Sequence, residues 1–220
     1  MRADRLLSIL MLLQSRNGMT APQLAEELEV SVRTIYANTV GWHASDSPEE
    51  SLNKYADLIE WSADRGILPG DAKEGLLRRS EEKPVEAQAV LERAREVRED
   101  IYRILSDTAH GRPIKTADLK GFNKALASML SHSRLAPYEG GLRWDWDTNV
   151  DKLDSVIWTV VRSAVDLVTS EAIKRVGHCA DEEGCGWLFW DSSRNRSRRW
   201  CDMSDCGNRA KVRRFYAKSK

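Results

Sequence analysis

Four cysteines toward the C-terminal end of the sequence have the spacing of a metal site. Cys179 and Cys185 form one close pair and Cys201 and Cys206 form a second, with fifteen residues between the pairs. Tetrahedral zinc suits this pattern, because each pair presents two thiolates and the intervening chain returns to complete the cage. Four protein ligands leave no open coordination position, so we expect one structural Zn²⁺ and no catalytic metal.

Two other uses of these residues stay open at this point. The four cysteines could instead form two disulfides, and His178, next to Cys179, could replace one thiolate. The apolar run from Leu6 to Leu13 is too short for a signal peptide and has no small-residue cleavage site after it. No stretch approaches the roughly 20 apolar residues that cross a bilayer. We therefore expect a cytoplasmic protein without a membrane partner, in which metal binding is favoured over disulfides.

Short elements around the cysteines are expected to hold them in place. Residues 187–190 (Trp-Leu-Phe-Trp) predict an apolar strand that packs over the metal, and residues 191–199 predict a polar turn. The residues after Cys206 predict a helix that begins at the metal. A module of this size has too little core to fold without its metal.

Basic residues gather in the same module. The whole sequence has 34 basic and 34 acidic residues, yet beyond residue 193 ten basic side chains face only Asp202 and Asp205. Such an end favours a polyanionic partner, which we take to be DNA, although RNA or an acidic protein fits the same charge pattern. Positions 209 and 213 share a helical face, so the metal is expected to orient them as a row beside the arginine-rich turn. The expected contacts are Arg194, Arg196, Arg198, Arg199, Arg209, Lys211, Arg213 and Arg214.

The middle of the chain predicts a mainly α domain with a small β-hairpin. Apolar residues recur at helical spacing in five segments, 47–65, 72–80, 84–105, 116–130 and 149–170. Residues 134–146 predict the hairpin, because two runs of strand-forming residues flank Glu139-Gly-Gly. The hairpin and the last helix supply candidates for a small-molecule pocket, although such residues more often belong simply to the core and its rim: Trp144, Trp146, Trp158 and Arg162.

The N-terminal segment has the pattern of a helix-turn-helix. Residues 2–15 predict a first helix, Thr20 caps a second, and a third begins at Ser31. A plain three-helix packing unit fits the same apolar pattern. The side chains expected to face a DNA major groove are Ser31, Arg33, Thr34 and Tyr36.

Three regions of the chain contain motifs that resemble bacterial regulator families. Asp191-x-Ser193-Arg-Asn-x-Ser-Arg-Arg-Trp-Cys201 and Cys206-Gly-Asn-Arg-Ala-Lys-Val-Arg-Arg-Phe are similar to the CGNR zinc finger. Asn38-Thr-Val-Gly-Trp, Tyr55-Ala-Asp-Leu and Gly141-Leu-Arg-Trp-Asp-Trp resemble the ABATE domain of stress-induced transcription regulators. Leu24-Ala-Glu-Glu-Leu-Glu-Val-Ser-Val-Arg-Thr-Ile-Tyr36 resembles the helix-turn-helix that opens DeoR-type and WYL-domain regulators, although the β-wing of those families is missing.

The resemblance implies a three-part chain: a helix-turn-helix segment over 1–37, truncated and fused on, an ABATE-like helical domain over 38–172 and a zinc finger over 173–220. It implies a bacterial DNA-binding transcription regulator whose central domain senses a small-molecule effector. A homodimer would match paired DNA half-sites, but no residue pattern decides the oligomeric state.

An interaction adaptor and an enzyme are the two other classes of function to compare with a transcription regulator. A zinc-stabilised protein- or RNA-interaction adaptor is the alternative, and steep salt dependence of duplex DNA binding separates the two. An enzyme is not expected, because there is no glycine-rich phosphate loop or nucleophile motif. The four histidines also fall in no ligand spacing.

Overall fold

The computed structural model describes residues 37–68, 72–146, 152–181 and 184–218. The predicted helix-turn-helix, with Ser31, Arg33, Thr34 and Tyr36, lies outside these residues. Within them the protein is mainly α, as expected. The long helices are α4 (Tyr55–Asp64), α5 (Ala72–Glu82), α6 (Pro84–Ala109), α7 (Thr116–Ser131), α8 (Ser155–Val168) and α9 (Asn208–Lys218).

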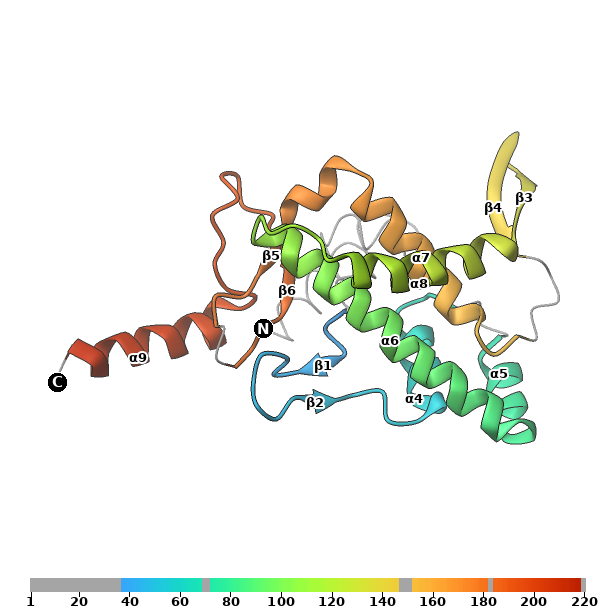
Figure 1. The fold of residues 1–220 in the computed structure, drawn as a ribbon, viewed down its shortest axis with the longest axis horizontal. Coiled ribbons are helices and arrows are strands. Elements are labelled where there is room, and N and C mark those ends of the chain that lie inside the picture. The colour runs from blue at the N-terminus through green and yellow to red at the C-terminus, as the bar shows by residue number, and fades with distance from the viewer. Residues whose placement is uncertain (1–36, 69–71, 147–151, 182–183, 219–220) are drawn as a thin grey trace, which may run out of the picture.

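Helix α6 is the central element of the fold. It runs through the body of the molecule and contacts α4, α5, α7 and α8, whereas α9 leaves the body as a projecting helix (Figure 1). Pro84 occupies its first turn, where the missing N–H has no partner to lose. Val90, Leu91, Ala94 and Ile101 lie on its buried face at helical spacing, and they belong to one hydrophobic core with buried residues of the neighbouring helices.

The strands form three small antiparallel sheets. Strand β1 (Val40–Gly41) pairs with β2 (Glu49–Glu50), β3 (Ser133–Tyr138) with β4 (Gly141–Trp146), and β5 (Val176–His178) with β6 (Leu188–Trp190). The predicted hairpin is thereby confirmed. Glu139 and Gly140 form its two-residue turn, and both have positive φ, as a primed hairpin turn requires.

One predicted helix is shorter than expected. The segment 47–65 becomes helical only at Tyr55, and Glu49–Glu50 form strand β2 instead. The Asp57 carboxylate accepts hydrogen bonds from the backbone N–H groups of Asn53 and Lys54, at 2.8 and 2.9 Å, and so fixes the start of α4. The prediction was wrong because Ser47-Pro48-Glu49 resembles a capping sequence, whereas Glu50 lies in β2 and binds an arginine of α6.

Glu50 pairs with a buried arginine of α6. Arg98 is 3% exposed, and its guanidinium binds both carboxylate oxygens of Glu50 at 2.7 Å and Glu99 at 3.0 Å. Burial by itself raises the pKa of Glu50, but the Arg98 guanidinium outweighs it, so the pKa lies below its usual value of 4.5. The pair therefore joins the segment that follows residue 38 to the central helix.

Substituting Glu50→Gln should destabilise the fold by about 2 kcal/mol near neutral pH, because a buried guanidinium loses its bidentate partner but keeps Glu99. A carboxylate with a lowered folded pKa stabilises above its unfolded value of 4.5 and loses that effect as the pH falls through the folded value. The difference from wild type should therefore disappear in acid. Urea unfolding from about pH 7 to about pH 3 measures it, with exposed Glu49→Gln as control. A difference that stays constant with pH would contradict this role.

Among the described residues, no helix combines the length and the apolar character that crossing a bilayer requires.

Candidate metal centre and its basic surroundings

The four cysteines converge on one point. Their sulfur atoms all lie within 4.8 Å of one another, with 3.4 Å between Cys185 and Cys201 and 3.6 Å between Cys201 and Cys206. A tetrahedral zinc ion with bonds of about 2.3 Å separates its sulfurs by about 3.8 Å. A disulfide needs about 2.05 Å, and all four thiols are free. The donor set and its size therefore fit a four-thiolate metal ion and not two disulfides.

Backbone hydrogen bonds fix both halves of the cluster. Cys179 follows β5, and its N–H donates to the carbonyl of Trp187 at 2.8 Å. In the second pair, Cys201 precedes a π-helical turn, Met203–Gly207, and Cys206 lies within this turn. The Asp202 carboxylate caps this turn by accepting from the Ser204 N–H at 2.7 Å, and α9 begins directly after it. The predicted strand over the metal and the helix that starts at it are both present.

Burial and mutual contact make the four thiols titrate together. The pKa of Cys179 is lowered far below the usual thiol value, because Cys185 and Cys201 donate hydrogen bonds to its sulfur. The pKa of Cys185 is raised to about 12 because it is the donor to Cys179. Contact with the same thiolate raises the pKa of Cys201, and burial raises that of Cys206. Four thiolates this close repel one another, so holding all four deprotonated requires a bound cation.

A buried aspartate shapes the arginine-rich turn that follows β6. Asp191 is 5% exposed, and its carboxylate accepts from the N–H groups of Ser193 at 2.8 Å and Arg198 at 3.0 Å. The guanidinium of Arg198 turns back onto the carbonyls of Trp200 and Cys201 and lies 4.9 Å from the ring of Phe189. The remaining arginines of the turn are exposed: Arg194, Arg196 and Arg199.

A second buried aspartate, Asp181, binds two of the arginines predicted to contact DNA. Its carboxylate is 1% exposed and accepts from Arg209 at 3.0 Å and from Arg213. These two arginines share a face of α9, as predicted, and both bind Asp181 although their own side chains are 31% and 48% exposed. Lys211 and Arg214 lie on the opposite face by helical spacing, and both are exposed.

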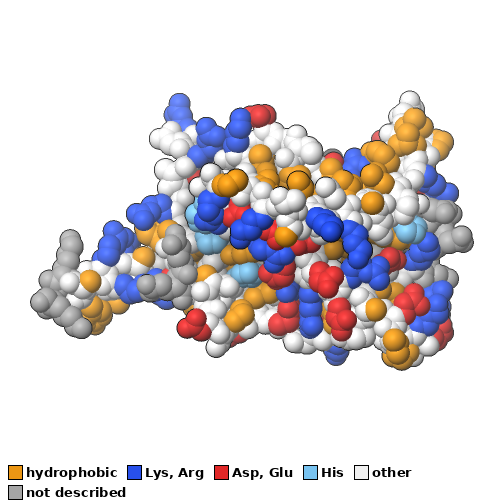
Figure 2. Space-filling model, viewed as in Figure 1, with side chains coloured by type: hydrophobic (Ala, Val, Ile, Leu, Met, Phe, Trp, Pro, Cys, Tyr) orange, Lys and Arg blue, Asp and Glu red, His pale blue; other side chains and the backbone are white. Residues whose placement is uncertain are grey.

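The end of the molecule that carries the cysteine cluster therefore has exposed cations on both the arginine-rich turn and α9. Figure 2 shows Lys and Arg side chains over the projecting turn and along α9. The sequence did not predict the role of Asp181, which is the shared partner of Arg209 and Arg213.

Three parts of the chain match known family models. Residues 36–171 match the model of the ABATE family, which is described as "Putative stress-induced transcription regulator". The chain belongs to the ABATE family. Residues 175–219 match the CGNR zinc finger, which includes all four cysteines, and residues 5–38 match an HTH domain. These matches confirm the three resemblances seen in the sequence and describe a DNA-binding regulator with a zinc finger. A search among curated proteins finds no match.

His178 is a contact of the ABATE domain and not a ligand of the cluster. Its Nε2 lies 3.0 Å from the Tyr102 hydroxyl of α6, and the group of residues able to hold a metal contains only the four cysteines. The ring of His110 lies 4.6 Å away, centroid to centroid. Among the described residues, this arrangement favours four cysteine ligands over a set that includes His178.

The candidate effector residues of the ABATE domain pack against one another. The Arg162 guanidinium lies 4.5 Å from the Trp144 ring, and the rings of Trp146 and Trp158 lie 5.9 Å apart. Trp158 is 2% exposed, and His132 stacks on it at 4.2 Å. The structure thus places the four residues in two contacts, a cation–π contact and a tilted pair of rings.

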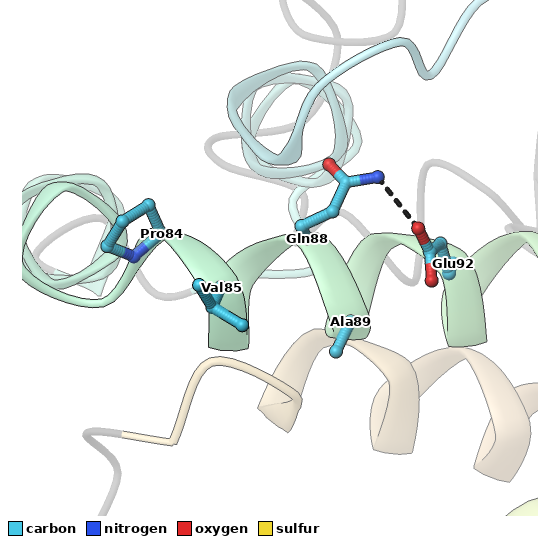
Figure 3. Close-up of a pocket in the computed structure, with 5 residues that line it drawn as sticks. All are labelled: Pro84, Val85, Gln88, Ala89 and Glu92. Carbon is cyan, nitrogen blue, oxygen red and sulfur yellow. Dashed lines mark hydrogen bonds between the residues drawn. The ribbon is translucent and has the colours of Figure 1, made fainter.

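A shallow pocket is found elsewhere, on the first turns of α6. Its walls come from a single helix face, and the one hydrogen bond drawn there joins Gln88 to Glu92 at 3.0 Å (Figure 3). Val85 in this pocket is 83% exposed, so the site is open to solvent and lacks polar groups that converge on a ligand. The residues are Pro84, Val85, Gln88, Ala89 and Glu92.

Proposed function

We propose that the protein is a bacterial transcription regulator in which one structural Zn²⁺, held by the four cysteines, fixes a DNA-binding surface. The observation that carries the proposal is the common scaffold: the cluster anchors both the arginine-rich turn and α9. In this account Arg198, Arg209 and Arg213 maintain the shape of the module through the contacts described above. The cations that bind phosphate are Arg194, Arg196, Arg199, Lys211 and Arg214.

The two other parts of the chain supply a second DNA contact and a signal. The HTH match over residues 5–38, with Ser31, Arg33, Thr34 and Tyr36 in its third expected helix, provides the second contact. An effector would bind the ABATE domain at Trp144, Trp146 and Trp158 and shift the population of DNA-binding conformations. The Trp158 indole N–H supports this site, because it is buried without a hydrogen-bond partner among the described residues. A homodimer on paired half-sites belongs to the same proposal.

A second candidate function follows from two aromatic residues on α9. Phe215 and Tyr216 are 68% and 66% exposed beside the basic face. Exposed aromatics next to cations bind single-stranded nucleic acid by base stacking. The adaptor alternative then becomes an RNA-binding module, and tighter binding to single strands than to duplex would favour it.

Removing two outward cations of α9 tests the DNA proposal. Lys211→Ala combined with Arg214→Ala should weaken binding to duplex DNA by about tenfold or more and lower the salt slope by about two, because two phosphate contacts disappear. Fluorescence anisotropy titrations over a series of salt concentrations measure both quantities. Lys120→Ala with Lys124→Ala on α7 removes the same charge from an exposed site outside the module and should leave both nearly unchanged. Equal losses in the two double variants would refute a local binding surface.

A further inference from the structure

The residues from Asn38 onward, at the end of the HTH match, are hydrogen-bonded to the zinc module. Asn38 is the last residue of that match, and Ala37 before it is fully buried. Both amide atoms of Asn38 bind the backbone of Leu188: Nδ2 donates to its carbonyl at 2.7 Å, and Oδ1 accepts from its N–H at 3.0 Å. Leu188 lies three residues after the metal ligand Cys185. A paired contact of this kind fixes the position of both chains.

Residues 38–44, which we name the coupling segment, also hold the turn around Cys185. The His43 N–H donates to the Cys185 carbonyl at 3.1 Å, and the Trp187 indole donates to the Val40 carbonyl at 2.9 Å. Gly186 has a φ of 62°, and a Cβ at this position would lie 2.8 Å from Ala44. Only glycine permits such close approach of the two backbones.

The coupling segment reaches α9 through Trp42. This residue has a φ of 52°, a left-handed conformation that is strained for a bulky side chain and persists only where its surroundings hold it. Its ring lies 4.5 Å from the guanidinium of Arg209, the arginine that binds Asp181. The ring also lies against Gly184, where a Cβ would be 3.3 Å from it. The zinc module therefore supplies the contacts that hold Trp42.

We propose that the coupling segment transmits the metal state of the cysteine site to the N-terminal DNA-binding segment. Metal coordination fixes the turn at Cys185 and the start of α9, and these two elements fix residues 38–44. Loss of the metal releases the turn, and with it the hydrogen bonds of Asn38, Val40 and His43. Ala37 and Asn38, the last two residues of the HTH match, are thus part of this anchor. The DNA-binding role of that segment rests on the proposed function, whereas the coupling itself does not.

Linkage makes the coupling measurable without DNA. If the metal stabilises the docking of the coupling segment, the docking must strengthen metal binding by the same factor. A variant that breaks the docking should therefore bind zinc more weakly, although it changes no ligand.

Hydrogen exchange on the wild-type protein is the first test. Removing zinc with a chelator should lower the protection of the His43 and Leu188 amides by at least about tenfold, because their acceptors lose their positions. The amides in the middle of α7, which lies in the ABATE domain, should change little. Unchanged protection of His43, while α9 loses its own protection, would overturn the proposal. No variant is needed, so a failure to fold cannot obscure the result.

Zinc affinity in matched variants is the second test. Asn38→Ala should weaken zinc binding about tenfold in a competitive chelator titration, because two part-buried hydrogen bonds disappear. Tyr102→Phe, which removes the 2.7 Å bond to the Gly186 carbonyl, should weaken it by about threefold. The controls are Asn53→Ala, whose amide donates to the Glu50 carbonyl, and Tyr55→Phe, whose hydroxyl donates to the Leu153 carbonyl.

Equal zinc affinities for Asn38→Ala and Asn53→Ala would overturn the coupling. Neither test contains DNA, so the two proposals can fail separately. A protein that shows the coupling but binds no nucleic acid would contradict only the proposed function. A protein that binds DNA through its zinc module, with exchange at residues 38–44 independent of zinc, would contradict only the coupling.

Discussion

Substituting Cys206→Ser should abolish stable zinc binding and unfold the C-terminal module. Cys206 is 1% exposed, contributes one of four sulfurs and is followed directly by α9. Structural zinc contributes about 10 kcal/mol or more to the folding of small metal modules, and three thiolates retain only part of it. The expected result is a zinc content falling from one ion per chain toward zero, with loss of the 11-residue helix α9 from the far-ultraviolet circular dichroism signal.

The ABATE helices should survive this substitution, because their core does not include the cluster. The apolar residues of α4, α6 and α8 form one continuous core, whereas the cysteines form a separate cluster with Trp200. Ala217→Ser, at an exposed position of α9, is the control for introducing a serine near the module. Full zinc content and an intact α9 in the Cys206→Ser protein would show that the metal is not the scaffold.

Substituting Asp181→Asn should have the second largest effect, although Asp181 binds no metal. The change leaves Arg209 and Arg213 without their shared carboxylate, which is 1% exposed. Breaking such a pair costs about 2 to 3 kcal/mol here, below the value for fully buried pairs because both arginines are partly exposed. Hydrogen exchange should show faster opening of α9 with zinc still bound.

Asp205→Asn is the matched control for Asp181→Asn. Asp205 also binds Arg209, four residues along the chain, but its side chain is 60% exposed. Exposed ion pairs of this kind contribute about 0 to 1 kcal/mol, because water screens them. Similar opening rates for α9 in the two variants would contradict the role assigned to Asp181.

The elements that the sequence predicted well are those whose signals are local. The cysteine spacing predicted the four-sulfur cluster, because tetrahedral zinc requires two close pairs of ligands. Helical periodicity predicted α6 and α8, and the Glu139-Gly140 turn predicted the hairpin. In each case the residues that define the element lie within one segment.

The features that the sequence did not reveal depend on partners far apart in the chain. No pattern in the sequence indicates that Asp181 is buried against α9. Glu50 belongs to a local capping pattern, but Arg98, 48 residues away, binds it and holds it in strand β2. The docking of Asn38 on Leu188 spans 150 residues. Such contacts follow from tertiary packing, which overrides local propensity.

The separation between shape-holding and outward cations changes how the basic end is understood. The sequence suggested one row of arginines on α9, whereas in the structure Arg209 and Arg213 bind Asp181. Lys211 and Arg214 on the opposite face are the ones free to meet phosphate in our proposal. Net charge alone could not make this distinction, because it counts all four residues equally.

The most direct test of the account is a titration of duplex DNA with the intact protein before and after metal removal. We expect the affinity to fall by at least about tenfold when a chelator removes the zinc, and to return when Zn²⁺ but not Mg²⁺ is added back, because thiolates select zinc. Zinc content is measured on the same samples. An unchanged binding isotherm in protein shown to be free of zinc would contradict the claim that the four-cysteine site builds the DNA-binding surface.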